Sequence, residues 1–183
     1  MKKLQFIGAL AMSISILACG GGDSTKTDSD GQTEVTDSPS ADYSNMEQIS
    51  LFDFGVDANI QLPKEDKGPR KIETSATGSV TVEVSDKFGI DINPFGLTVS
   101  EKKEELNGDL VYTIEYIEDT ADKIIYKKSI TDNEEIETEY HFYLTKSIGG
   151  ELFSVQSLPK VFSQKAIDKM ILSAESVDAN DPS

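Results

Sequence analysis

The stretch from residue 135 to residue 159, EIETEYHFYLTKSIGGELFSVQSLP, decides the fold. It contains two runs rich in aromatic and β-branched residues on either side of the segment SIGGE, and the second run ends at a proline. Such runs favour extended strands, and a short glycine turn between them is typical of a β-hairpin. The preceding segment KIIYKKSI (123–130) has a similar composition and predicts another strand. Strands joined by tight turns form an antiparallel sheet.

Two earlier segments alternate in the manner of half-buried strands. The segment VDANIQLP (56–63) places apolar residues at every second position and ends at a proline. The segment 80–92 shows the same alternation on both sides of a break at Asp86, and it predicts either two strands or one long strand. The charged segment KEDKGPRK (64–71) between them predicts a turn.

The stretch from Thr98 to Asp119 fits two structures. Leu106, Leu110 and Ile114 recur at helical spacing, and the serine and glutamates before them suit a helix N-terminus. The second half also alternates between apolar and polar residues, and it follows an NGD sequence that is typical of a hairpin. We predict one amphipathic helix over the whole stretch, with a strand in the second half as the alternative.

The last part of the chain predicts a helix. Ser163 suits an N-cap, and the apolar residues after it fall on one helical stripe: Ala166, Ile167, Met170, Ile171 and Ala174. The predicted class is therefore α+β, with an antiparallel β-sheet of about five to seven strands and one or two helices packed on one face. We expect this single domain at residues 49–177, followed by a frayed tail at 178–183.

The order of these elements resembles domains of the Mog1/PsbP type. The resemblance rests on a strand that ends in Leu62–Pro63 and on a final helix that reads KAIDKMILSAES (165–176). Such domains are compact antiparallel sheets flanked by helices, and they often serve as binding or accessory modules. The resemblance concerns shape alone and assigns no functional residue.

Composition excludes several classes of function. The chain has 183 residues, with 33 Asp and Glu against 17 Lys and Arg, for a formal net charge of −16. This charge argues against nucleic acid as a partner. A single cysteine and a single histidine exclude an internal disulfide, a multi-thiolate metal site and a histidine-rich metal cluster.

The N-terminus, MKKLQFIGALAMSISILACGGGD, has the features of a secretory signal. Lys2 and Lys3 form a basic start, and the mostly apolar stretch 4–17 is too short for a stable membrane span, which needs about 20 residues. Small residues then surround the only cysteine, Cys19.

The sequence Ile16-Leu17-Ala18-Cys19, followed by Gly20, resembles the lipobox of bacterial lipoproteins. In that family the cysteine thiol receives a diacylglyceryl group, a dedicated peptidase cuts before the cysteine, and the new N-terminus is often acylated. The resemblance implies a signal peptide at residues 1–18 and a lipid attached to Cys19. It also implies localisation in the cell envelope, in the outer membrane if the organism has two membranes. The alternative is an ordinary signal peptide with an incidental cysteine.

The segment after the signal peptide has the composition of a flexible tether. Residues 19–48 comprise the lipidated cysteine and an acidic linker rich in Gly, Ser, Thr and Asp, which contains too few apolar residues to offset the entropy of ordering it. We predict that this segment is disordered and holds the domain away from the membrane.

Candidate catalytic residues are few. His141 lies on a predicted strand and shares a face with Glu139 and Tyr143, so a histidine–carboxylate pair could act as a general base. The alternative is a structural histidine bonded to its neighbours. The acidic run from Asp132 to Glu139 could bind Ca²⁺, but it lacks the ligand spacing of a calcium loop, and its alternate glutamates are typical of a solvated strand face.

The sequence therefore predicts a lipid-anchored envelope protein whose domain is a non-catalytic binding or adaptor module, without cofactor or metal. Its expected partners are the membrane, through the lipid on Cys19, and an envelope protein or small ligand. One alternative is a carrier or sensor of a small apolar ligand, which requires a pocket between sheet and helix. A second is a lipid-anchored hydrolase that uses His141, which requires a serine or carboxylate within hydrogen-bond reach in a cleft.

Overall fold

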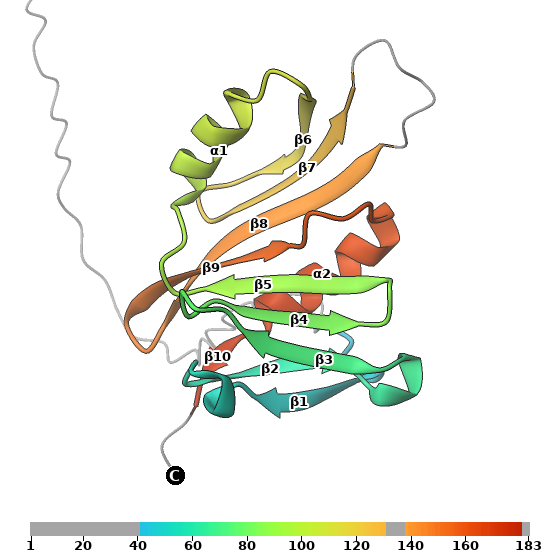
Figure 1. The fold of residues 1–183 in the computed structure, drawn as a ribbon, viewed down its shortest axis with the longest axis vertical. Helices are drawn as coiled ribbons and strands as arrows, with labels where there is room; N and C mark the ends of the chain where they lie inside the picture. Colours follow the sequence, from blue (N-terminus) through green and yellow to red (C-terminus); the bar gives the residue numbers. More distant parts are fainter. Residues whose placement is uncertain (1–40, 131–137, 181–183) are drawn as a thin grey trace, which may run out of the picture. The chain divides into compact units, whose positions relative to one another are not determined.

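The computed structural model describes residues 41–130 and 138–180, which form two antiparallel sheets (Figure 1). The larger sheet has seven strands in the order β3-β4-β5-β9-β8-β7-β6, and the smaller has three in the order β1-β2-β10. The prediction of an α+β fold built on an antiparallel sheet is confirmed.

The predicted hairpin lies in the middle of the larger sheet. Strand β8 (Glu139–Ile148) pairs with β9 (Glu151–Ser157) across a turn at Gly149 and Gly150, whose φ angles are both positive. Glycine adopts this conformation at little cost, which explains the pair of glycines. The other strands of this sheet are β3 (Arg70–Thr74), β4 (Val80–Val84), β5 (Phe88–Asn93), β6 (Thr113–Asp119) and β7 (Lys123–Ser129).

The smaller sheet extends the ordered chain beyond the predicted limits of 49 and 177. Strand β1 (Met46–Ser50) pairs along its length with β2 (Ala58–Pro63), and β10 (Asp178–Ala179) pairs with β2 on its other side. Both added strands contain few apolar residues, so their composition resembles that of a linker or tail. Backbone pairing with β2 places them in the sheet, and an ion pair of 2.5 Å between Glu47 and Arg70 also holds β1.

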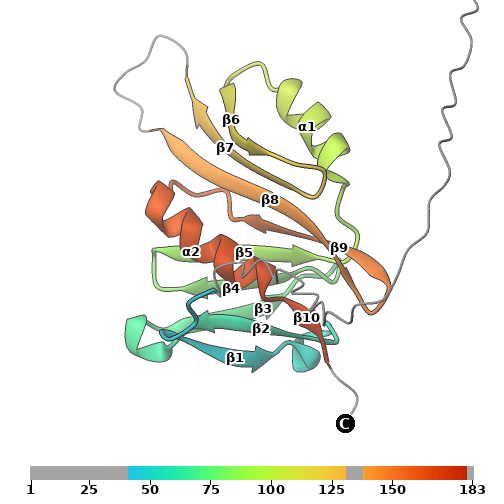
Figure 2. The same cartoon turned by 180° about the vertical axis from the view of Figure 1, so that it is seen from behind.

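The two helices lie on opposite faces of the larger sheet (Figures 1 and 2). Helix α2 (Gln164–Glu175) begins after the predicted N-cap Ser163 and packs on the face that carries Phe142. Helix α1 (Val99–Asn107) packs on the face that carries Tyr143. Phe142 and Tyr143 are neighbours on β8, and successive side chains of a strand point to opposite faces.

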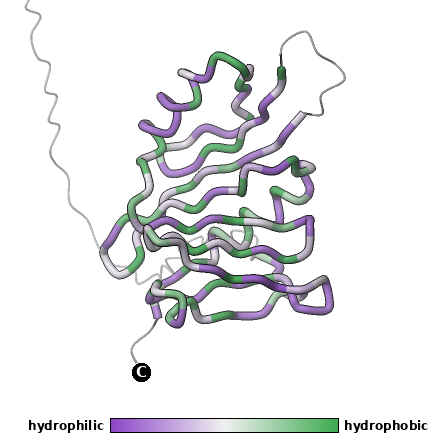
Figure 3. The backbone as a smooth tube through the Cα atoms, in the orientation of Figure 1, coloured by the Kyte–Doolittle hydropathy of each residue, from purple (hydrophilic) through white to green (hydrophobic). Residues whose placement is uncertain are grey.

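Each helix covers its own core. Hydrophobic and hydrophilic residues alternate along β4 and β7 (Figure 3), whereas residues 141–144 of β8 are all buried, because β8 faces a core on each side. The larger core lies between α2, the larger sheet and β2, and its fully buried members include Leu51, Ile60, Ile90, Phe142 and Met170. The smaller core under α1 consists of Val99, Leu106, Ile124, Tyr126 and Tyr143.

The prediction of one helix over 98–119 is wrong for the second half. Helix α1 ends at Asn107, and β6 then pairs with β7. Pairing with a neighbouring strand outweighs the helical spacing of the apolar residues, and the β-branched and aromatic residues of this half favour that outcome. The helix start is a capping box, in which Thr98 and Glu101 bond each other's backbone N–H groups.

One further detail differs from the sequence predictions, and one of the two alternatives left open for 80–92 is confirmed. The charged segment 64–71 contains a short 3₁₀ turn, η2 (Glu65–Lys67), but β3 already begins at Arg70 and had not been predicted. The segment 80–92 forms two strands instead of one, because the chain reverses at 85–87 and Val84 pairs with Phe88. A second 3₁₀ turn, η1 (Phe52–Phe54), connects β1 to β2.

Candidate functional site

Several predicted features lie outside the described residues. These are Cys19 with its signal and most of the tether, and residues 132–137 of the acidic run. None of the helices in the described part of the chain is long and apolar enough to cross a membrane. Within the same residues, no three His, Cys, Asp or Glu side chains are grouped so that they could hold a metal ion.

His141 is buried at the centre of a small hydrogen-bonded group. Its side chain lies between β7 and β9, and the residue is only 4% exposed. The Nδ1 atom lies 2.9 Å from the Ser157 hydroxyl, and the Nε2 atom lies 3.1 Å from a carboxylate oxygen of Glu139. The ring of Tyr126 stacks against the imidazole, with 5.6 Å between the centroids. The structure thus brings together the predicted pair, Glu139 and His141, and adds Ser157, which the sequence analysis did not single out.

The environment of His141 favours the neutral imidazole. Burial lowers the pKa of His141, and this effect outweighs the opposing influence of Glu139. Burial also raises the pKa of Tyr126 above its ordinary value. A neutral imidazole whose Nε2–H donates a hydrogen bond to Glu139 accepts at Nδ1 a hydrogen bond from the Ser157 hydroxyl. All the hydrogen-bonding capacity of the ring is then used within the protein.

Ser157, His141 and Glu139 are connected in the same order as the nucleophile, general base and orienting carboxylate of a serine hydrolase. A substrate, however, has little access to the serine. A serine nucleophile must meet its substrate beside the base. Ser157 is 7% exposed, and neither of the two cavities described below is lined by Ser157 or His141. The arrangement is therefore that of a satisfied buried polar cluster.

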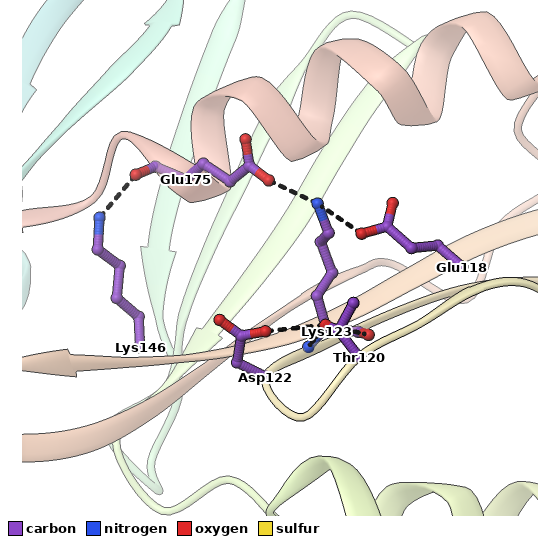
Figure 4. Close-up of polar contacts among 6 residues, drawn as sticks. All are labelled: Glu118, Thr120, Asp122, Lys123, Lys146 and Glu175. Atoms are coloured by element: carbon purple, nitrogen blue, oxygen red, sulfur yellow. Dashed lines mark hydrogen bonds and ion pairs between the residues drawn. The ribbon is translucent and has the colours of Figure 1, made fainter. Parts of the chain in front are cut away.

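A polar cavity of about 280 Å³ lies between the β6–β7 hairpin, β8 and the end of α2 (Figure 4). The ammonium of Lys123 lies 2.8 Å from the Glu175 carboxylate and 3.0 Å from that of Glu118. Burial alone would lower the pKa of Lys123, but its bonds to Glu175 and Glu118 raise it. Lys146 donates to the backbone carbonyl of Glu175 at 2.6 Å. The charges here bind one another and connect the hairpin to the helix end.

A larger groove, of about 560 Å³, lies beside α2. It is formed by the helix, the start of β1, the end of β2 and the turn between β4 and β5. Its apolar lining consists of Met46, Pro63, Val84, Phe88 and Leu172, and three lysines (Lys67, Lys87 and Lys169) also line it. Small-molecule sites are concave, mostly apolar and roughly 300–1,000 Å³ in volume, with a few polar groups. The groove has this character.

The groove could not be predicted from the sequence, because its lining comes from four separate segments of the chain. One local signal was present. Leu172 is apolar but lies off the buried stripe of α2, and it is only partly covered. An apolar residue beside the core-facing stripe marks a second contact surface of a helix.

Comparison with known proteins gives no relative. No family model, no curated protein and no solved structure matches this chain.

Proposed function

We propose that this chain is a lipid-anchored protein of the cell envelope whose domain is a non-catalytic binding module, with the groove beside α2 as its binding site. The observation that carries the proposal is the groove itself, with about 560 Å³ of space beside partly covered apolar side chains. The groove also supports the alternative predicted from the sequence, a carrier or sensor of a small apolar ligand, which needs such a pocket.

The position of the domain follows from the N-terminal sequence. A diacylglyceryl group on Cys19 would anchor the chain, because two acyl chains bind a membrane far more persistently than one. The predicted acidic tether would then hold the groove within reach of the membrane and of other envelope components.

The test is site-specific photocrosslinking in intact cells. The photoreactive amino acid p-benzoylphenylalanine replaces Leu172 in the groove and, in the control, Leu152, which is 46% exposed on β9 and does not line the groove. We expect a defined adduct at position 172 and none at 152. Equal labelling at both positions, or no adduct at either, would reject the groove as the binding site.

The second candidate function is a hydrolase that uses Ser157, His141 and Glu139. The two hydrogen bonds of His141 favour it, and the burial of Ser157 opposes it. A fluorophosphonate probe distinguishes the candidates, because it labels an activated and accessible serine. We expect no label on Ser157, whereas labelling that His141→Ala abolishes would support the hydrolase.

A further inference from the structure

We propose that the groove binds amphiphiles with a single anionic head group, such as a carboxylate or phosphate on a hydrocarbon chain. In this arrangement Lys87 and Lys169 bind the head group, and the chain lies on Val84, Phe88 and Leu172. The inference rests on the proposed function, because it names the ligand class of the same groove.

The apolar side of the groove is continuous with the larger core. Val84 and Phe88 are 2% and 5% exposed, so they form a rigid base for the groove. Leu172 and Met46 are partly covered and stand at its sides. A hydrocarbon chain gains free energy for each methylene group that such a surface removes from water.

Lys87 and Lys169 indicate that the ligand of the groove is an anion. No carboxylate of the described residues lies within 4.0 Å of either ammonium group. Most other basic residues of the described part do have such a partner: Lys67, Arg70, Lys71, Lys102, Lys103, Lys123, Lys127 and Lys160. Lys64, Lys128, Lys146 and Lys165 also have no carboxylate partner among the described residues, but Lys87 and Lys169 are the two such lysines that line the groove.

Asp42 also lines the groove and keeps its negative charge, because a backbone hydrogen bond lowers the pKa of its carboxyl. Asp42 accepts a hydrogen bond of 3.0 Å from the backbone N–H of Ser44. Lys67 is paired with Asp66 at 3.0 Å, so we assign the head group to Lys87 and Lys169 instead.

The backbone fixes one rim of the groove. Ser85, in the turn that carries Lys87, has a positive φ of 56°. Gly68 lies so close to this turn that an added Cβ would be 2.7 Å from the Ser85 Cβ. The backbone N–H of Ser85 also donates to the Pro69 carbonyl at 3.1 Å. The turn is therefore held against the segment after η2.

On the opposite wall, α2 presents a charge and an apolar group together. Lys169 and Leu172 are three residues apart and so lie on the same side of the helix. Each wall of the groove thus has one lysine beside an apolar side chain, Lys87 beside Phe88 and Lys169 beside Leu172. Such a surface can bind the head group and the hydrocarbon chain of an amphiphile together. The acidic segment that precedes the domain, residues 20–40, is a weaker candidate occupant, because Val35 is its only sizeable apolar residue.

The test uses the full lipidated protein in phosphatidylcholine nanodiscs and two photoactivatable probes. One is a diazirine-bearing dodecanoate, and the other is the corresponding dodecanol, which has the same chain without the charge. We expect the carboxylate probe to label peptides that contain residues 84–88 and 169–172, and the alcohol to label them about tenfold less, since a charge-assisted bond of about 1.5 kcal/mol corresponds to that ratio.

The matched variants are Lys87→Gln with Lys169→Gln, and Lys165→Gln as the control. Lys165 lies on the same helix and also has no carboxylate within 4.0 Å among the described residues, but it does not line the groove. We expect the carboxylate probe to label the double variant about tenfold less than the wild type, and to label Lys165→Gln as strongly as the wild type.

The outcomes separate the two proposals. Equal labelling by both probes, unchanged in the double variant, would overturn the anionic head group while groove binding remains. A crosslink from position 172 to residues 20–40, or to another protein, would reject the amphiphile as the ligand, while the groove would remain a binding site. Absence of probe labelling together with absence of any adduct at position 172 in cells would reject both proposals.

Discussion

The Nδ1 atom of His141 and the hydroxyl of Ser157 are 2.9 Å apart in a part of the larger sheet that is closed to solvent. Two neighbouring strands each supply one member of this pair, and Glu139 satisfies the other nitrogen. The pair links β8 to β9. A buried polar group lowers stability unless it is hydrogen-bonded, so removal of either partner should destabilise the fold.

We expect Ser157→Ala to lower the free energy of unfolding by about 1–2 kcal/mol, because the Nδ1 atom would be left without its partner. His141→Ala should cost about 3 kcal/mol, since it also leaves a cavity. Denaturant unfolding measures both values. Ser147→Ala, at an exposed position of β8, serves as the control and should change stability by less than about 0.5 kcal/mol. A Ser157→Ala variant as stable as the wild type would contradict the role of the pair.

Stability should fall as the pH drops from 7.5 to 5. The pKa of His141 is lower in the folded protein than in the unfolded chain, so below about 6.5 the unfolded chain takes up the proton first. The contribution of the neutral imidazole is complete above that value and is lost as the pH falls through the folded pKa. His141→Gln should show a smaller loss over the same range in denaturant titrations. Parallel pH profiles for the two proteins would rule out this assignment.

Lys123→Met should lower stability by about 1 kcal/mol, because Lys123 binds both Glu175 and Glu118 beside the cavity of Figure 4. The matched control is Lys71→Met. Lys71 pairs with Glu73 on an open surface, so this change should have little effect. A double-mutant cycle with Glu175→Gln isolates the pair, and a coupling energy near zero would contradict the prediction.

Thr98→Ala should destabilise α1 by about 1 kcal/mol, because the variant loses the hydroxyl that accepts the Glu101 backbone N–H and donates to the Glu101 carboxylate, while the bond from the Thr98 backbone N–H to Glu101 remains. Amide hydrogen exchange resolves the effect. Exchange should quicken in α1 and stay unchanged in α2, whose cap at Ser163 is intact, while Thr98→Ser should behave like the wild type. Equal acceleration in both helices would indicate a global effect instead.

Cys19→Ser should abolish incorporation of radiolabelled palmitate and move the protein to the aqueous phase of a detergent partition. The reason is that the serine hydroxyl cannot form the thioether through which the diacylglyceryl group would be attached. Val35→Ser, in the predicted tether, leaves Cys19 in place and should keep the label. Palmitate that still appears on Cys19→Ser would reject the lipoprotein assignment.

The elements that could be predicted are those in which one pattern dominates. The β8–β9 hairpin combines two apolar, β-rich runs with a pair of glycines, and α2 combines a serine cap with a clear stripe. The boundary after Asn107 could not be placed, because Leu106 and Ile114 fit the helical period while the residues of β6 also alternate. Pairing with β7 decides between the two, and pairing is not a local property.

In the candidate sites, too, contacts within one strand could be predicted from the sequence, and contacts between separate segments could not. The contact between Glu139 and His141 follows from strand geometry, since residues two apart share a face. The contact with Ser157 requires β9 to lie beside β8 at the observed register. The groove requires β1, β2, the β4–β5 turn and α2 to meet, and no single segment carries that information.

Strand β1 has a mechanical consequence. It is an edge strand that bonds only to β2 in its sheet, and its first pair joins Met46 to Pro63, which has no N–H to donate. Met46 and Pro63 both line the groove. A force applied through the residues before β1 would load the Met46–Pro63 end of this pair, and with it one side of the groove. If the residues before β1 tether the domain to a membrane, as proposed above, a ligand that contacts both Met46 and Pro63 would oppose their separation.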